Sequence, residues 1–377
     1  MGKRTILKKD AKKTEPRRGV KPPTPISDGA LGSLVAWFRR QRRVLPWREE
    51  PTVYRVWISE IMLQQTQVVT VLPYFERFMA RFPRVEDLAG ADEETVMKAW
   101  AGLGYYSRAR NLHAAAKRLV ERGARGGAGR GFPTTKEGWL EVPGVGPYTA
   151  GAVTSIALGL PEPIVDGNVE RVFARLRRLA RSAGETVYKE NLWELSRAAV
   201  ERAHRDGWSP SDVNQAWMEL GATVCTPKKP ACLLCPIRAE CAAFADGVVE
   251  AYPEKKKRAA WVEVTEERVA LVDPRAAKVY LEKVVAGEWR AGLWDFPAAA
   301  PKGMKSARSA LGAIETNHVV THHKIRRQLR IFAARAGAEG STGARGRKGR
   351  WVSLENPEVA LGSAPREGIL RLRERFT

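Results

Sequence analysis

Long apolar runs, internal repeats and scattered cysteines are all missing from this chain of 377 residues. Because there is no run of about eighteen apolar residues, no membrane-spanning helix is expected. The N-terminus also lacks the apolar core of a signal peptide. Cysteine is absent from the other 360 residues once the segment 225–241 is set aside. Any role for cysteine must therefore be found in that one short segment.

The four cysteines are arranged as a possible metal-binding loop. They have the spacing C-x6-C-x2-C-x5-C and are Cys225, Cys232, Cys235 and Cys241. Four thiolates in one loop can bind iron or zinc. A zinc ribbon usually has two separated C-x2-C knuckles, whereas this loop has one, which favours a [4Fe–4S] cluster, although the spacing matches neither ferredoxin pattern. Zinc, disulfides and buried free thiols are the alternatives. Such a cluster indicates a reducing, cytosolic or nuclear-type compartment.

Positive charge far exceeds negative charge, with 64 Lys and Arg against 42 Asp and Glu and a formal net charge of +22. Residues 1–22 contribute +7 of this charge and the rest of the chain +15, so the excess is not confined to a tail. Such a charge favours a polyanionic partner, because Lys and Arg neutralise phosphates and release counterions. Nucleic acid is therefore the expected partner.

Composition divides the chain into four regions. Residues 1–27 are rich in Lys, Arg and Pro, and are predicted to form a disordered basic arm. Residues 28–245 are predicted to be mostly helical, because apolar residues recur there at helical spacing. The expected helices are 30–43, 52–72, 73–82, 94–101, 107–121, 147–158, 168–180, 186–204 and 211–222. Residues 246–261 are polar and basic and are predicted to be a linker.

Residues 262–377 have a different pattern. The segments VEVTEERVALV, KVYLEKVV, QLRIFAAR and RWVSL alternate in polarity and are rich in β-branched residues. Alternation with that composition is typical of strands. A C-terminal α+β domain is therefore predicted.

A polar line of Glu60, Gln64 and Gln67 runs along the helix predicted over 52–72, at positions i, i+4 and i+7. The immediate neighbours of Glu60 are mostly apolar. A carboxyl desolvated in this way is expected to have a raised pKa and to donate a proton near neutral pH. A solvent-facing polar stripe is the alternative interpretation.

Residues 134–158 have the pattern of a helix-hairpin-helix. Gly144 and Gly146, in the turn PGVG, allow the backbone to approach a phosphate closely. The small-residue helix that follows offers its N-terminal N–H groups to the anion. Contacts of this kind do not depend on the DNA sequence.

A third motif, VDGNV, precedes an amphipathic helix and contains Asp166 and Asn168. Both are good N-cap residues, so a purely structural role would explain them. A catalytic role for Asp166 gains weight only from its place along the chain, after Glu60 and the hairpin and before the four cysteines.

This ordered set resembles the helix-hairpin-helix base-excision glycosylases, and among them the MutY-type adenine DNA glycosylases. The resemblance covers residues 30–370 and is carried by LPWR (45–48), WISEIMLQQTQV (57–68), GLGYYSRARNLH (102–113), VPGVGPYTAGA (142–152), VDGNV (165–169) and the four-cysteine loop. The family removes adenine mispaired with 8-oxoguanine after flipping the adenine out of the duplex.

The resemblance implies a catalytic role for four residues. Glu60 matches the general acid that protonates the adenine. Asp166 matches the second carboxylate, which stabilises the oxocarbenium-like sugar or traps it covalently. Tyr148 and Asn168 match residues that position these groups.

Contacts with DNA are implied in the same way. Gln65 and Tyr105 match residues that enter the opened helix near the lesion pair, and Gln64 is expected to support them. Arg48 and Trp47 match the wall of the base pocket.

Position 148 separates two reactions. The related endonuclease III enzymes have a lysine at this position, and its amine attacks the sugar and permits strand cleavage. This chain has Tyr148, which predicts a monofunctional glycosylase. A thymine-mismatch glycosylase of the same superfamily could also have a tyrosine here, but Glu60 and the added C-terminal domain argue against it.

The C-terminal segment AGLWDFP (291–297) is similar to the Nudix-like domain with which the family recognises 8-oxoguanine. Asp295 is the one acidic residue within 292–312, so pyrophosphate hydrolysis is not expected. In the family a Phe-Ser-His loop contacts the lesion. This chain has Val-Thr-His, so Thr321 and His322 are the expected contacts and the aromatic is lost. His323 and Lys324 are candidates for compensating contacts.

The predicted protein is multidomain, with an all-α helix-hairpin-helix glycosylase core that carries an iron–sulfur loop and a C-terminal α+β Nudix-like domain (262–377). The expected function is that of a monomeric, cytoplasmic, DNA-associated glycosylase without membrane contact. Its expected partner is duplex DNA with 8-oxoguanine·adenine or guanine·adenine mispairs. The alternatives are a non-enzymatic iron–sulfur protein that binds damaged DNA, and a thymine or pyrimidine glycosylase of the same superfamily.

Overall fold

The computed structural model describes residues 23–126, 131–255, 260–285, 287–301, 309–336 and 347–376. Packing divides the chain into two compact units, Met1–Arg42 with Pro163–Glu254, and Arg43–Glu162 with Lys255–Thr377. Residues 1–22 of the predicted basic arm lie outside the described residues. The domain division at 246–261 stays a prediction. Within the described ranges, no helix is both long and apolar enough to cross a membrane.

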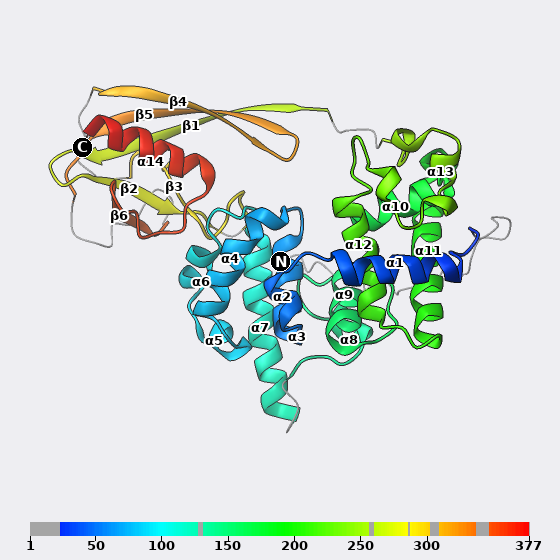
Figure 1. Ribbon diagram of the computed structural model, residues 1–377. Helices are drawn as coiled ribbons and strands as arrows, with labels where there is room; N and C mark the ends of the chain where they lie inside the picture. The colour runs from blue at the N-terminus through cyan, green and yellow to red at the C-terminus, as the bar shows by residue number, and fades with distance from the viewer. Residues whose placement is uncertain are drawn as a thin grey trace, which may run out of the picture. The chain divides into compact units, whose positions relative to one another are not determined.

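The first unit is a group of helices packed around α12. Its helices are α1 (Asp28–Gln41), α10 (Gly167–Arg177), α11 (Glu185–Arg205), α12 (Pro210–Thr223) and α13 (Ala242–Ala245) (Figure 1). Ser27 and Ser209 accept hydrogen bonds from the first turns of α1 and α12, which explains where these helices begin. Phe173 of α10 packs edge-on against Trp217 of α12, with ring centroids 4.9 Å apart. This contact packs α10, which follows the motif VDGNV, against α12.

The second unit begins with a helical part that surrounds a core rich in aromatic side chains. Its helices are α2 (Pro46–Glu49), α3 (Val53–Leu63), α4 (Val68–Arg81), α5 (Val85–Gly90), α6 (Glu93–Trp100), α7 (Ser107–Gly126), α8 (Lys136–Leu140) and α9 (Pro147–Leu158). The most enclosed is α3, in which Tyr54 and residues 56–62 are all buried. It packs against α9, so the predicted acid and the helix after the hairpin share one interface.

The helix predicted over 52–72 is wrong as a single element. α3 ends at Leu63 and α4 begins at Val68. Between them Gln65 has φ +57°, which no α-helix accommodates, and Gln67 is extended as the N-cap of α4. The second helix was predicted to begin at Pro73. Instead, Pro73 lies inside α4, on an exposed face of that helix. Of the three residues predicted to form one polar line, only Glu60 therefore lies on α3. Gln64 and Gln67 lie in the segment between α3 and α4.

The rest of the second unit is a mixed sheet with one long helix. Its elements are β1 (Val262–Asp273), β2 (Lys278–Lys283), β3 (Trp294–Asp295), β4 (Gly312–Val320), β5 (His323–Ala333), β6 (Gly349–Ser353) and α14 (Ser363–Phe376). The strand order is β3-β2-β1-β5-β4, β6 pairs with β2, and β1 and β5 are parallel. This is the α+β arrangement predicted for the segment, although the sequence did not indicate β3, β4 or α14.

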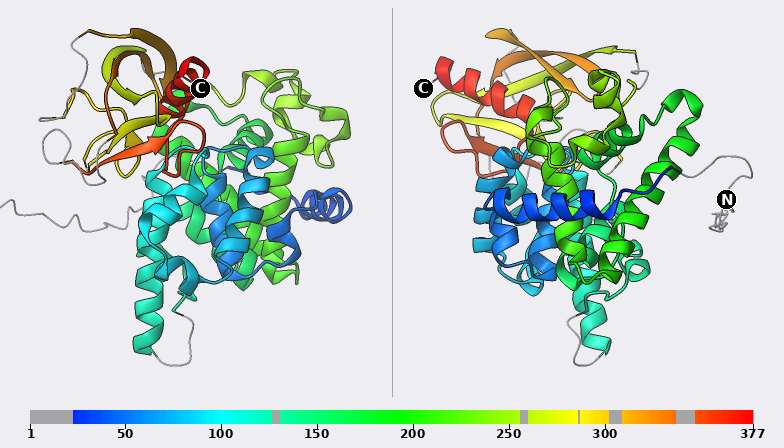
Figure 2. Two further views of the ribbon diagram at one scale, coloured as in Figure 1. Left: turned by 90° about the vertical axis from the view of Figure 1, so that its left-hand side faces the viewer. Right: turned by 45° about the vertical axis from the view of Figure 1, so that its right-hand side comes forward.

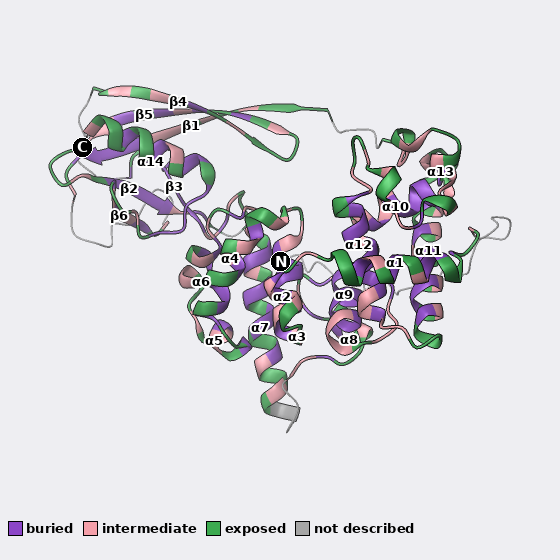
Figure 3. Ribbon diagram, in the orientation of Figure 1, coloured by how far each residue is buried: buried purple, intermediate pink, exposed green. Residues whose placement is uncertain are grey.

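One face of the sheet carries its hydrophobic core. Ile369 and Leu372 of α14 pack with Leu329 and Ile331 of β5, and α14 lies against this face (Figure 2). Burial is uneven along β1, which is exposed where it begins and buried where it ends (Figure 3). The end of the sheet that includes the β4–β5 hairpin is thus its exposed end.

Candidate active site and cysteine loop

Glu60 lies on α3 inside the protein and is only 4% exposed. The Tyr148 hydroxyl donates a hydrogen bond to Glu60 Oε2 at 2.7 Å. Tyr148 is the second residue of α9, which begins after Gly146 with Pro147 in its first position. The start of α9 therefore aims the phenol at the carboxyl. Of the two interpretations of Glu60, the buried carboxyl is confirmed and the solvent-facing stripe is wrong.

The predicted hairpin lies between α8 and α9. Gly144 has φ +80°, and a Cβ built on it would lie 2.9 Å from Asn111 Cβ. Both facts require glycine at this position. Gly146 is the N-cap of α9 and has open space around its Cα. The turn thus brings bare backbone to the beginning of a helix, as the motif predicts.

The segment that ends α3 is partly exposed, and a hydrogen bond joins it to α9. Gln64 Nε2 donates to Thr149 Oγ1 at 3.2 Å. The next residue, Gln65, is exposed and has the left-handed conformation. Tyr105, in the loop before α7, is 46% exposed and also left-handed, with φ +46°. Backbone strain of this kind, in two exposed loops, is typical of functional sites.

Arg108 joins these two loops, and the sequence analysis did not single it out. Its guanidinium donates to the carbonyls of Met62 at 2.8 Å and Gln64 at 2.5 Å, and to those of Leu103 and Gly104 at 3.2 Å. Burial lowers the pKa of Arg108 to about 10. The guanidinium therefore ends α3 and orders the loop of Tyr105 at once. The only sign of Arg108 in the sequence is its place in the segment GLGYYSRARNLH, three residues after Tyr105.

The two residues assigned to the base pocket lie around α2. Trp47 is 6% exposed and packs edge-on against Phe75 at 5.2 Å. Arg48 Nη1 donates to the Arg43 carbonyl at 3.1 Å. Trp47 is therefore a core residue in this arrangement, and Arg48 is fixed by backbone.

Asp166 belongs to the other unit, so it is described with its own neighbours. It is the N-cap of α10, and Oδ1 accepts from the backbone N–H of Asn168 at 2.9 Å and of Val169 at 2.7 Å. Asn168 Nδ2 donates to Oδ2 at 2.9 Å. Burial raises the pKa of Asp166 above its ordinary 3.8, while these hydrogen bonds oppose the rise. The capping interpretation is confirmed for Asp166, and the cap also fixes the direction of the carboxylate.

A hydrogen-bonded chain connects Asp166 with the cysteine loop. Arg171 Nη2 donates to Asn168 Oδ1 at 2.8 Å and to the Gly221 carbonyl at 2.7 Å. Its Nε donates to the Cys225 carbonyl at 2.7 Å. The carboxylate, the amide, the guanidinium and the loop are thus linked in one sequence of contacts within this unit.

The four cysteines are free thiols that line one cavity of about 30 Å³. A disulfide, one of the alternatives, is absent from this loop. Burial raises the pKa of Cys235 to about 11, and also raises the pKa of Cys232 and Cys241. Across the described ranges, no three His, Cys, Asp or Glu side chains are already grouped as metal ligands.

A buried cation stands beside this cavity. Arg175 is 1% exposed and its Nη1 donates to Cys225 Sγ at 3.2 Å. It also donates to the carbonyls of Thr226 at 2.8 Å and Tyr252 at 2.9 Å. Because a buried guanidinium favours nearby negative charge, the cavity suits thiolates bound to a metal centre. Four cysteine side chains around one cavity and this cation have the chemistry that a metal centre requires, although within the described residues the thiols are not grouped as ligands.

The remaining predicted residues lie in the β4–β5 hairpin. Val320 of β4 pairs with His323 of β5, so Thr321 and His322 are the two turn residues. Thr321 has φ +54°, which is an outlier for a β-branched residue, and its hydroxyl donates to the Val320 carbonyl at 2.7 Å. Both turn residues are exposed. The hairpin thus presents them at the exposed end of the sheet.

Comparison with known proteins identifies the relatives of this chain. The sequence profile of the HhH-GPD superfamily of base excision DNA repair proteins matches residues 58–198. The adenine DNA glycosylase of Homo sapiens is 45% identical over 221 residues, which are 56% of this chain and 39% of that protein. The adenine DNA glycosylase of Schizosaccharomyces pombe is 34% identical over 323 residues, 70% of this chain and 68% of that protein.

A bacterial relative is similar over a comparable region. The adenine DNA glycosylase of Buchnera aphidicola subsp. Schizaphis graminum is 38% identical over 226 residues, 60% of this chain and 62% of that protein. The chain spans about two fifths of the length of the human relative, 39%. The region matched by the HhH-GPD profile, residues 58–198, includes Glu60, Tyr148 and Asp166.

Proposed function

The chain belongs to the adenine DNA glycosylases of the helix-hairpin-helix superfamily, and from this premise we propose that it removes adenine mispaired with 8-oxoguanine or guanine. The reaction is hydrolysis of the N-glycosidic bond of a base flipped out of the duplex. The observation that carries the proposal is the buried carboxyl of Glu60 held by the Tyr148 hydroxyl at 2.7 Å. Such a pair suits proton donation to a base and has no amine that could form a Schiff base.

Glu60 acts as the general acid. Its proton passes to a ring nitrogen of the flipped adenine, which turns the base into a neutral leaving group. The Tyr148 hydroxyl, bonded to Oε2, stabilises the negative charge that remains on the carboxylate. The reaction thereby starts with protonation of the base by Glu60, a residue that is only 4% exposed.

Asp166 acts in its ionised form on the sugar. Two backbone N–H groups and the Asn168 amide hold its oxygens, so the carboxylate has a fixed direction. It stabilises the positive charge that develops at the anomeric carbon, or bonds to it, before water adds there. Asn168 is thus a positioning residue rather than a reacting group.

DNA is held by parts of the chain that present backbone or exposed side chains. The turn at Gly144 and Gly146 contacts phosphates, and Gln65 and Tyr105 enter the opened duplex beside the mispair. Both residues have left-handed backbone conformations, and Arg108 holds both loops through the carbonyls of Gln64 and Gly104. Loops that are ordered before DNA binds support this role. Gln64 supports Gln65 and Tyr105, and Arg48 and Trp47 form the wall of the base pocket.

The cysteine loop holds a [4Fe–4S] cluster through Cys225, Cys232, Cys235 and Cys241. When bound, the cluster acts as a structural cross-link that fixes the loop. Arg175 offsets the negative charge of the thiolates, and the basic side chains of Lys228 and Lys229 lie on the same loop for phosphate contact. A cluster of this kind would also fit a reducing, cytoplasmic compartment.

The C-terminal sheet is proposed to be a Nudix-like domain that recognises 8-oxoguanine, with Thr321 and His322 as contacts. Their exposure at the hairpin supports this assignment. The enzyme is proposed to act as a monomer on one duplex.

The role assignments are tested with Glu60→Gln and Asp166→Asn under single-turnover conditions. Each variant should bind the mispaired duplex with near-normal affinity yet release no measurable adenine. Glu76→Gln and Asp206→Asn change exposed carboxyls of the same types and serve as matched controls that should keep full activity. Near-normal excision by either catalytic variant would overturn the assignment. Tight binding without excision by the unaltered protein would favour a non-enzymatic damage-binding protein.

A further inference from the structure

An exposed patch lies beside the β4–β5 hairpin. Val262 of β1 and Val320 of β4 both pair with His323 of β5, so the three side chains share one face of the sheet. Trp289, from the loop before β3, sets its ring edge-on against His323 with centroids 4.6 Å apart. Val262, Val320 and Trp289 are 43%, 38% and 47% exposed. An aromatic ring is thus present on the face of Val320, supplied by a different loop.

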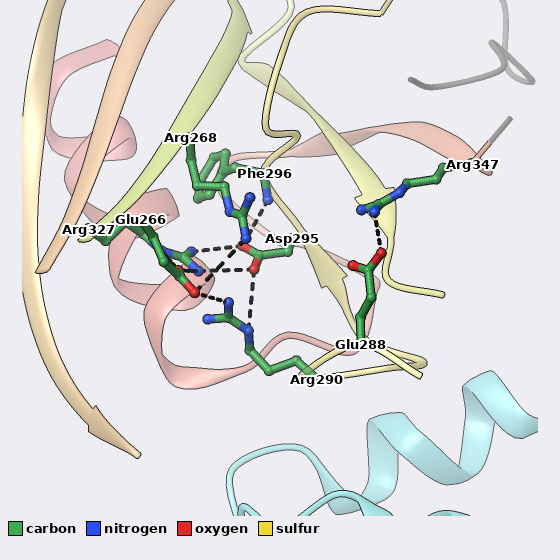
Figure 4. Close-up of polar contacts among 8 residues, drawn as sticks. All are labelled: Glu266, Arg268, Glu288, Arg290, Asp295, Phe296, Arg327 and Arg347. Atoms are coloured by element: carbon green, nitrogen blue, oxygen red, sulfur yellow. Dashed lines mark hydrogen bonds and ion pairs between the residues drawn. The ribbon is translucent and has the colours of Figure 1, made fainter. Parts of the chain in front are cut away.

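Ion pairs hold the loop of Trp289 on both sides. Glu288 pairs with Arg347 at 2.5 Å, and Arg290 donates to Glu266 at 2.6 Å (Figure 4). Glu266 is in turn held by Arg327, which is 1% exposed. Glu288 is therefore tied to Arg347, just before β6, and Arg290 is tied to Glu266 of β1. A ring whose loop is already ordered loses little conformational entropy when it contacts a ligand.

A second exposed tryptophan lies on the opposite face. Trp261 is 54% exposed, and Lys324 Nζ lies 5.5 Å from its ring centroid. Lys324 follows His323 along β5, so its side chain points to the other face of the sheet. The two tryptophans have similar exposure and differ in the face that they occupy.

The chemistry of the patch fits a nucleobase. A flat exposed ring with apolar neighbours is what stacking on a base requires. The strained Thr321 turn, one residue beyond Val320, lies at the same end of the sheet. Trp289, unlike Trp261, lies on the face of Val320, the residue that stands where the resembling family has an aromatic one.

We propose that Trp289, supported by His323, packs against the purine opposite the excised adenine and strengthens binding to the mispaired duplex relative to the fully paired one. Trp289 thus supplies the aromatic contact that Val320 cannot make. The inference rests on the proposed function for the identity of the mispair, and it adds a specificity-determining residue outside the Val-Thr-His segment.

The test compares Trp289→Ala with Trp261→Ala in the Glu60→Gln background. Binding is measured by fluorescence anisotropy with duplexes that carry adenine opposite 8-oxoguanine or opposite guanine, and with a fully paired duplex. Trp289→Ala should weaken binding to the 8-oxoguanine duplex by about 5- to 150-fold, the range for loss of one base–aromatic contact. Binding to the paired duplex should change less than about twofold, because an indole ring carries no charge that could neutralise a phosphate. Trp289→Phe should recover part of the loss, and Trp261→Ala should bind normally.

Three outcomes would overturn the inference. One is unchanged binding by Trp289→Ala; another is equal losses for the two tryptophan variants. The third is a loss of the same size on the paired duplex, which would indicate contact with the backbone. Thermal denaturation of each variant establishes that it is folded, and Trp289→Phe repeats the test with a smaller change. Failure of the unaltered protein to excise adenine would contradict the proposed function alone, since the binding comparison does not depend on catalysis.

Discussion

Replacing Tyr148 with phenylalanine removes one hydroxyl and its hydrogen bond to Glu60 Oε2 at 2.7 Å, and leaves the ring in place. A hydrogen bond to a neutral group contributes about 0.5 to 1.5 kcal/mol, and one to a charged group about 1.5 to 3 kcal/mol. Only the difference accelerates the reaction, because Glu60 is neutral before it donates its proton and charged afterwards. A difference of about 1 to 1.5 kcal/mol predicts a rate reduced roughly 5- to 13-fold.

The assay is single-turnover excision of adenine with enzyme in excess, so that product release does not limit the rate. Tyr54→Phe is the matched control, because Tyr54 lies on the same helix α3, is 7% exposed and donates to the Phe82 carbonyl at 3.0 Å. It should lose about 1 kcal/mol of stability and keep its rate. A reduction below about twofold in Tyr148→Phe would refute the differential hydrogen bond. A reduction far above the range would mean that the hydroxyl does more than stabilise the carboxylate.

Three further substitutions test other parts of the site. Asn168→Ala removes a donor that lowers the pKa of Asp166, so this pKa should rise further above 3.8 and the acidic limb of the pH–rate profile should move to higher pH. A limb that stays in place would contradict the requirement for ionised Asp166. Gly144→Ala must adopt φ +80° against Asn111, and should lose about 1 to 2 kcal/mol of unfolding free energy and bind every duplex more weakly; unchanged denaturation midpoints would refute this strain. Arg175→Gln should be purified with less iron per protein, as measured by metal analysis and visible absorbance, and full iron content would show that the loop does not need this cation.

Much of the fold follows from periodic patterns. The helix predicted over 147–158 coincides with α9, because Pro147 favours a first helical position and Gly159 has the left-handed conformation that ends it. The alternating segments of the C-terminal part became β1, β2, β5 and β6. Patterns of this kind are local, and they predict secondary structure correctly where tertiary packing favours the same conformation. The family resemblance read from the motifs is confirmed by the match to adenine DNA glycosylases.

The errors arise where distant residues decide the local conformation. The chain leaves the helix after Leu63 because Arg108, more than forty residues later, takes the carbonyls of Met62 and Gln64. No residue between 60 and 70 signals this break. β4 was missed because its side chains alternate weakly and it is held mainly by pairing with β5.

The candidate residues could be identified from motifs, but the hydrogen bonds and packing contacts between them could not. Tyr148 and Glu60 are 88 residues apart along the chain, and their bond depends on the packing of α9 against α3. Trp289 follows no motif. It lies on the face of Val320 because its ring contacts His323, which pairs with Val320 across the sheet. Residue types can suggest a chemistry, whereas distances between helices and strands decide which groups meet.

The central claim is tested most directly by incubating the purified protein, in excess, with duplexes that carry adenine opposite 8-oxoguanine, guanine or thymine. Alkali converts abasic sites into strand breaks, and an untreated sample reveals intrinsic cleavage. The account predicts alkali-dependent breaks at adenine, fastest opposite 8-oxoguanine, and no breaks without alkali. Intact adenine in every duplex, with tight binding retained, would contradict it.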